Sequence, residues 1–130
     1  MADYSVKRIG EMETAFRGAY KRARAELGVQ AFGMQVLDLP PRLEQFPEHD
    51  HAESGQEEVY VVMSGSGEIE IEGERLPIDP ETIVRVGPDT KRKIYTGDEP
   101  MRVLALGGVP GAAYDAPDVS QLGAPDPMAP

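Results

Sequence analysis

The feature of this sequence that most constrains its fold is a series of short apolar or alternating runs, each ended by turn-forming residues. Gly, Pro and Asp gather where the runs end, as in Pro40-Pro41 and Gly87-Pro88-Asp89. About eight such runs follow one another, with turn signals roughly every 8–12 residues, which is typical of an antiparallel sandwich or barrel. The sequence therefore predicts an all-β fold built from short strands.

The expected strands differ in how many of their faces are buried. Residues 59–63 are all apolar and indicate a buried strand, whereas residues 68–72 read Glu-Ile-Glu-Ile-Glu and indicate a strand with one face in water. This alternation assigns the glutamates to solvent rather than to a metal, and Gly73-Glu74 predicts a hairpin turn after them. The expected strands are 31–39, 42–46, 57–64, 68–72, 75–78, 82–86, 92–96 and 101–106.

Before the strands, apolar residues recur at helical spacing between Thr14 and Leu27. Steps of three and four residues join them, and Gly28 follows as a residue that commonly ends helices. We therefore predict a helix over this span, laid against the barrel. The apolar positions are Phe16, Ala19, Tyr20, Ala23 and Leu27.

A chain of 130 residues suits one domain with one modest core. We divide it into an N-terminal extension with the short helix (1–30), a β-barrel (31–108) and a C-terminal tail rich in Gly, Ala and Pro (109–130). A tail of this composition has few side chains to bury. Tyr114 and Leu122 are the residues expected to attach it to the body or to another subunit.

The two histidines of the chain, His49 and His51, are separated by one residue. In an extended strand, residues two apart point to the same face, so both imidazoles would project into one space. Glu58 follows at the start of the buried strand and is a plausible third ligand. Two histidines and a carboxylate with open positions suit non-haem iron(II), and also catalytic zinc or manganese.

This stretch resembles the first motif of the cupin superfamily: His-x-His, a short spacer, Glu, six residues and Gly. His49-Asp50-His51 supplies the histidines, and Glu58 to Gly65 keeps the six-residue spacing, although the loop before Glu58 is longer than usual. The resemblance implies a jelly-roll barrel with a divalent metal (Fe, Mn, Zn or Ni) held by His49, His51 and Glu58.

The second cupin motif is only partly present. Pro88 matches its proline, but Lys93 stands where the family has its fourth metal ligand, a histidine. A protonated lysine has no lone pair to donate and repels a cation. Either Lys93 pairs with Glu58 in place of a metal, or it turns to the pocket mouth and holds an anionic substrate.

Three further residues complete the predicted small-molecule pocket: Gln56, Tyr60 and Arg85. Gln56 lies in the long loop, Tyr60 also suits core filling, and Arg85 also suits a surface ion pair. One hypothesis is a metal-dependent enzyme, of the dioxygenase or isomerase type, acting on a small polar molecule. The alternatives are a non-catalytic binding module and a structural cupin without a metal. Whether the protein is an enzyme stays open at this point.

The composition excludes several functional classes. A formal net charge of -10 argues against nucleic-acid binding, and no apolar run approaches the roughly 18 residues of a membrane span. The chain has no cysteine, which is compatible with a cytoplasmic location. Because exposed strand edges of a small barrel are commonly covered by pairing, we expect a homodimer.

Overall fold

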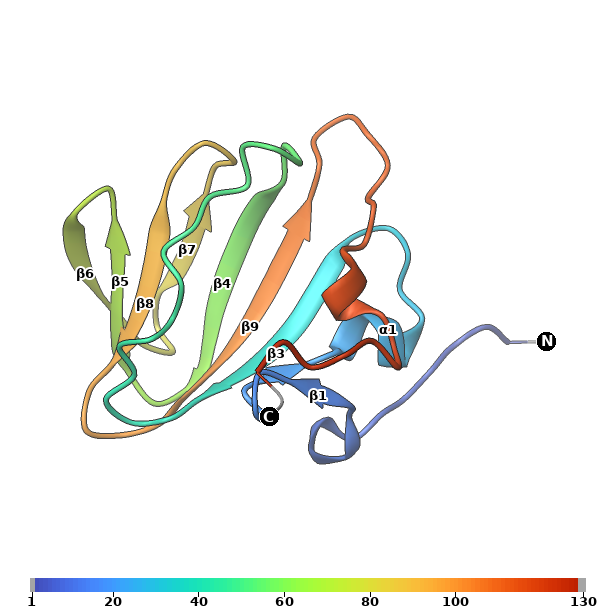
Figure 1. The fold of residues 1–130 in the computed structure, drawn as a ribbon, viewed down its shortest axis with the longest axis horizontal. Coiled ribbons are helices and arrows are strands. Elements are labelled where there is room, and N and C mark those ends of the chain that lie inside the picture. The colour runs from blue at the N-terminus through green and yellow to red at the C-terminus, as the bar shows by residue number, and fades with distance from the viewer. Residues whose placement is uncertain (1, 129–130) are drawn as a thin grey trace.

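The computed structural model describes residues 2–128 and shows two antiparallel sheets that form a jelly-roll barrel (Figure 1). The larger sheet has the strand order β1-β2-β3-β9-β4-β7, and the smaller one has the order β6-β5-β8. The strands are β1 (Thr14–Ala15), β2 (Tyr20–Lys21), β3 (Gly33–Leu39), β4 (Glu57–Ser64), β5 (Gly67–Ile71), β6 (Glu74–Ile78), β7 (Ile83–Val86), β8 (Arg92–Thr96) and β9 (Met101–Gly108). The helices are α1 (Ala23–Leu27) and two 3-10 turns, η1 (Ile9–Glu11) and η2 (Asp118–Ser120).

The main core lies between the two sheets. Alternate residues of β9 are buried, and the same alternation in β4 turns Tyr60 and Val62 inward, because successive side chains of a strand point to opposite faces. From the smaller sheet, Ile69 and Ile94 are fully buried against them. Removing these side chains from water is the main favourable contribution to the stability of the barrel.

A second, smaller core lies on the outer face of the larger sheet. Val36 of β3 faces outward there and is covered by Ala23 of α1 and by Met12. The helix predicted near the N-terminus is therefore present and packs on the barrel, but only over Ala23–Leu27. Gly28 ends it as predicted, with φ 80° and its N–H donating to the Arg24 carbonyl at 2.9 Å.

The prediction of a helix is wrong for residues 14–22. Phe16 and Arg17 adopt left-handed backbone angles (φ 53° and 57°), and the chain turns back at Gly18. The resulting hairpin joins the edge of the larger sheet, where Tyr20 pairs with Leu37. Pairing with an existing strand satisfies backbone groups that a short, isolated helix would leave to water, which explains why the helical spacing did not decide the structure.

The predicted strand at 42–46 is also wrong, while the other predicted strands are present and end within two residues of the expected positions. Pro40 and Pro41 before this segment and Pro47 after it have no N–H to donate, so a regular ladder cannot continue past either end. It runs irregularly along the barrel and is held by the Leu43 N–H, which donates to Thr96 Oγ1 at 2.7 Å.

The C-terminal tail folds back over the N-terminal hairpin (Figure 1). Arg22, which is 1% exposed, donates to the carbonyls of Val119 and Ala124, each at 2.9 Å, and pairs with Glu13 at 3.1 Å. Tyr114 contacts the backbone at Gly33, as expected of an attachment point, whereas Leu122 is 51% exposed. The tail has few apolar side chains to bury, and hydrogen bonds from one buried arginine hold it against the protein instead.

No helix among residues 2–128 has both the length and the apolar character needed to cross a bilayer.

We expect Gly65→Ala to destabilise the protein by about 3 kcal/mol. Gly65 follows β4 with φ 79°, and an added Cβ would overlap the carbonyl oxygen of Pro100. The matched control is Gly73→Ala: Gly73 has φ 86° but open space around the Cβ position, so only the backbone strain of about 1–2 kcal/mol applies. Urea unfolding measures both values, and equal losses would contradict this account.

Candidate metal centre

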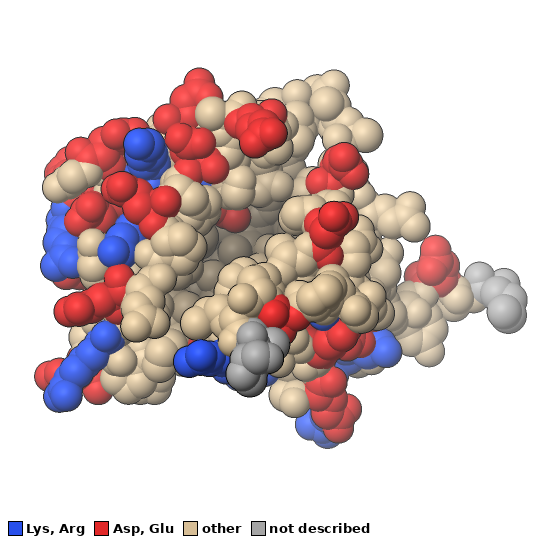
Figure 2. Space-filling model, in the orientation of Figure 1, with Lys and Arg blue, Asp and Glu red and all other residues tan. Residues whose placement is uncertain are grey.

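The structure brings His49, His51 and Glu58 together between the two sheets. One ligand atom from each lies within 4.8 Å of the others. The three residues line a cavity of about 1310 Å³, and Figure 2 shows the hollow in this face of the molecule. The three residues predicted as metal ligands are therefore close enough to hold one ion.

Backbone contacts fix the two histidines. The His49 N–H donates to the Arg92 carbonyl at 3.0 Å, and the Arg92 N–H donates back to the His49 carbonyl at 2.9 Å. The His51 N–H donates to the Pro88 carbonyl at 2.8 Å. The pair is thus attached to β8 and to the turn before it, and the imidazole centroids lie 5.0 Å apart.

Glu58 reaches the same space from the opposite sheet. It lies at the start of β4, where the strand alternation points it inward together with Tyr60. The glutamate is 8% exposed, and the buried Tyr60 hydroxyl donates to its Oε1. His51 Nε2 lies 3.4 Å from the same oxygen, and Nη1 of Arg92 lies 3.7 Å from it.

These neighbours keep Glu58 ionised. Burial by itself would raise the pKa of this carboxyl, but His51, the Tyr60 hydroxyl and the charge of Arg92 together hold its pKa below the usual value. Burial and the adjacent carboxylate raise the pKa of Tyr60, so its hydroxyl keeps its proton and acts as a donor.

Both histidines present a nitrogen suited to a metal. Burial lowers the pKa of His49, which favours the neutral imidazole, and its Nδ1 lies 2.9 Å from the Pro47 carbonyl. A carbonyl can only accept, so Nδ1 carries the proton and Nε2 keeps its lone pair. His51 Nε2 is buried and has no well-directed hydrogen bond in the described part of the chain. This unsatisfied nitrogen fits a ligand position.

The cation beside the site is Arg92 and not Lys93. Ile94 of β8 is fully buried, so Arg92, two residues earlier, also points inward and is 0% exposed. Lys93 points to the outer face, where its Nζ lies 5.0 Å from the centre of the Tyr95 ring. The second cupin motif suggested Lys93 as the cation that points inward. The alternation of buried side chains around Ile94 identifies Arg92, one residue earlier, instead.

The other predicted pocket residues divide into two pairs. Gln56 and Tyr60 line the cavity. Arg85 is outside it, exposed on β7 and paired with Glu57 at 2.9 Å, and Lys93 is also outside it. Lys93 and Arg85 therefore do not line this cavity, because both lie on outward-facing positions of their strands.

The arrangement fits a divalent metal. It offers two imidazole nitrogens and one ionised carboxylate, the donor set of many sites that keep open positions for a ligand. Arg92 opposes a metal through its charge but leaves Glu58 ionised. Its Nη2 is held by the Gly87 carbonyl at 2.8 Å, which directs this part of the guanidinium toward the backbone.

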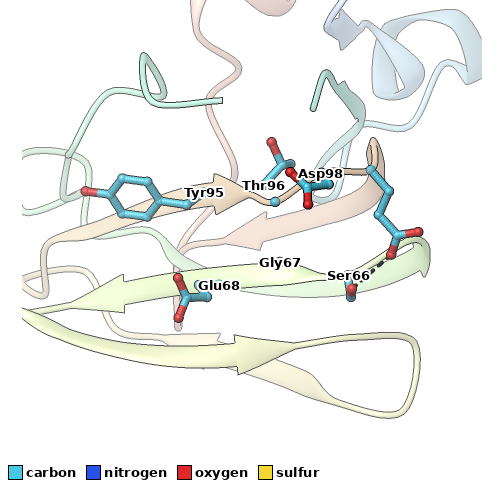
Figure 3. A pocket seen from close by; sticks show the side chains of 8 residues that line it. Ser66, Gly67, Glu68, Tyr95, Thr96 and Asp98 are labelled. Carbon is cyan, nitrogen blue, oxygen red and sulfur yellow. Dashed lines mark hydrogen bonds between the residues drawn. The ribbon is translucent and has the colours of Figure 1, made fainter. Parts of the chain in front are cut away.

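A second, smaller pocket lies at the end of the three-stranded sheet (Figure 3). Its volume is about 250 Å³, and it is lined by hydroxyls and carboxylates without a histidine. Glu99 accepts a hydrogen bond there from Ser66 at 3.0 Å. Because it has no imidazole, this pocket does not offer the set of metal ligands found at His49, His51 and Glu58.

Fold and site together define a small β-barrel with a candidate metal centre between its sheets. The chain belongs to the cupin family: the family model of the cupin domain matches residues 35–107. No curated protein matches the sequence.

Several solved structures share the fold. A cupin protein from Bacteroides fragilis has a TM-score of 0.71 and 24% identity, with 90% of this chain and 93% of that chain covered. A sugar phosphate isomerase of the cupin superfamily from Silicibacter pomeroyi has a TM-score of 0.66 and 18% identity over 88% and 83%. A putative sugar phosphate isomerase from Acidithiobacillus ferrooxidans has a TM-score of 0.61 and 25% identity over 75% and 65%.

In metal-free protein, we expect Tyr60→Phe to lower the free energy of unfolding by about 1–3 kcal/mol at pH 7. The pKa of Glu58 is depressed in the folded state, so the stabilisation it provides is present above its unfolded pKa and is lost as pH falls through the folded pKa. The cost of the substitution should therefore shrink in acid. Urea unfolding at a series of pH values measures it.

The matched control is Tyr95→Phe. The Tyr95 hydroxyl donates to Glu70 at 3.3 Å on the outer face, where no buried carboxylate depends on it. We expect a small change that does not vary with pH. A Tyr60→Phe cost that is the same at pH 7 and in acid would contradict the assigned role of this hydroxyl.

Proposed function

We propose that this cupin binds one divalent metal ion through His49, His51 and Glu58 and uses it to bind a small molecule in the cavity. The observation that supports the proposal best is the buried His51 Nε2, which has no well-directed hydrogen bond and lies 3.4 Å from the ionised Glu58. An ion between these atoms would satisfy the nitrogen and balance the carboxylate.

Under this proposal the metal supplies a Lewis acid or a redox centre, which suits reactions of the isomerase or dioxygenase type. The residues of the chain orient and hold protons around it. Tyr60 donates to Glu58 and keeps one of its oxygens fixed, and His51, Tyr60 and Arg92 together keep the carboxylate ionised. Gln56 lies on the cavity wall, where its amide can orient a bound molecule.

The second candidate function is a non-catalytic binding module. The fully buried Arg92 favours it, because a guanidinium 3.7 Å from Glu58 already places a positive charge next to this carboxylate. In that case the ion pair takes the place of the metal, and the cavity binds its ligand without one.

Elemental analysis of protein purified without chelator and without an affinity metal separates the two. We expect about one ion of iron, manganese, zinc or nickel per chain, lost in the double variant His49→Ala with His51→Ala and strongly reduced in Glu58→Gln. Asp50→Asn is the control, since Asp50 lies between the histidines but outside the ligand set, and it should keep the metal. A wild-type protein that holds no metal even after reloading would favour the binding module.

We also propose that the protein is a homodimer. Ile83 of the edge strand β7 is 72% exposed and pairs with Val61, and Met63 shares that outer face and is 44% exposed. A second copy would cover these apolar side chains and the free strand edge.

We expect light scattering to give the mass of two chains for the wild type and of one chain for Ile83→Lys. Leu76→Lys is the control, because Leu76 is a partly exposed apolar residue on β6 of the other sheet. A wild-type protein with the mass of one chain would contradict the proposal.

A further inference from the structure

The cavity wall combines polar and apolar side chains. The candidate ligands His49, His51 and Glu58 line it together with Gln56 and Tyr60, and the Phe46 ring lies 5.8 Å from the His49 ring. Apolar side chains form much of the remaining wall: Leu37, Leu39, Leu43, Phe46 and Met101. A molecule that reaches the candidate metal with a polar head therefore lays the rest of its body against apolar surface.

Part of the cavity wall comes from segments near the two ends of the chain. Tyr20 of the N-terminal hairpin and Tyr114 of the tail both line the cavity. Burial raises the pKa of each phenol, so both are uncharged at neutral pH. The tail is fixed over the hairpin by the contacts of Arg22, and the Asp126 carboxylate accepts from the Phe16 N–H at 2.8 Å. These contacts give the cavity a second wall of aromatic and aliphatic groups.

The charges around the cavity are unfavourable for an anion. Two basic residues line it, against five acidic ones: Arg17 and Arg102, against Asp38, Asp50, Glu53, Glu58 and Asp115. Arg102 is neutralised by a two-pronged pair with Asp38, at 2.6 and 3.0 Å. Arg17 is exposed, and its Nε donates to the Met128 carbonyl at 3.4 Å. Among residues 2–128, no ion pair neutralises Asp50, Glu53 or Asp115.

A phosphate or carboxylate on the ligand would need a cluster of cations or free N–H groups to replace its hydration. The residues that could have supplied it, Lys93 and Arg85, lie on the outer faces of the sheets. The volume of about 1310 Å³ exceeds the roughly 300–1,000 Å³ of common small-molecule pockets, so size does not restrict the cavity to a small polar compound.

Building on the proposed metal centre, we infer that the ligand of this cavity is an uncharged molecule with a largely apolar body and one oxygen-donor head directed at His49, His51 and Glu58. We expect sugar phosphates and other organic anions to bind more weakly, because Asp50, Glu53 and Asp115 line the cavity and none of them has an ion pair among residues 2–128. The ligand class thus differs from that in the names of two structural neighbours, the sugar phosphate isomerases.

The test compares two ligands with the same metal-binding head and the same chain length. Octanohydroxamate ends in a methyl group, whereas the monohydroxamate of suberic acid ends in a carboxylate. Titration calorimetry on the full chain, metal-loaded and metal-free, with metal content measured on each sample, gives the two affinities. We expect octanohydroxamate to bind at least about tenfold more tightly than its carboxylate analogue, because its chain is buried against apolar side chains.

Variants assign the selectivity to the wall. Leu43→Asn should weaken octanohydroxamate severalfold and leave acetohydroxamate, which is the head alone, unchanged; Leu76→Asn on the outside of β6 should change neither. Glu53→Gln combined with Asp115→Asn should narrow the gap between the two long ligands. Both residues are exposed, so these changes leave the core intact.

Acetohydroxamate separates this inference from the proposed function. If it binds the metal-loaded protein but the octyl chain adds no affinity, the metal centre stands and the inferred ligand class is overturned. If the protein holds no metal and acetohydroxamate does not bind, but octanohydroxamate is still preferred over its carboxylate analogue, the metal proposal fails and the ligand class stands. Equal or tighter binding of the carboxylate analogue overturns the inference in either form of the protein.

Discussion

The candidate site depends on one buried ion pair between the two sheets. Arg92 comes from β8 of the smaller sheet, and Glu58 comes from β4 of the larger one. A charge removed from water is costly unless it has a partner, so each of these residues requires the other. The pair lies beside His51 and the Tyr60 hydroxyl, and together these groups keep ionised the carboxylate that a metal would share. The chemistry of the cavity follows from this contact.

The same arrangement explains why the second motif of the family is altered without loss of the fold. The strand that carries the family's fourth ligand still crosses the barrel, and Ile94 still fills the core. At the start of β8, the buried Arg92 points inward and places a positive charge beside Glu58. A metal held here has three protein ligands and a cation nearby, which leaves more of its positions to a bound molecule.

The two termini act as parts of the pocket rather than as appendages. The hairpin of β1 and β2 extends the larger sheet. The tail crosses this hairpin and is held there by hydrogen bonds from Arg22. Because Tyr20 and Tyr114 then face the cavity, segments far apart in the sequence shape the space available to a ligand. The division into N-terminal extension, barrel and C-terminal tail reflects the composition of the chain. Residues from all three parts line the cavity.

Much of the fold was predictable because it depends on local patterns. Alternation and turn residues gave most strands of the barrel, and His-x-His with Glu58 gave the three grouped donors. The hairpin at residues 14–21 was not predictable, because its helical spacing competes with pairing to β3, a partner distant in sequence. Lys93 was misplaced for a related reason: a motif aligns residues along the chain, but the buried Ile94 decides which side chains of β8 point inward.

The sequence by itself determined most strands of the barrel, the three candidate metal ligands and the acidic balance, since each is a property of neighbouring residues or of composition. Only the tertiary structure decided that Arg92 faces Glu58, that Lys93 and Arg85 lie outside, and that the cavity has a largely apolar wall closed by both termini. Those features arise from contacts between the two sheets and between the chain ends, and such contacts are set by which faces pack together rather than by spacing within one segment.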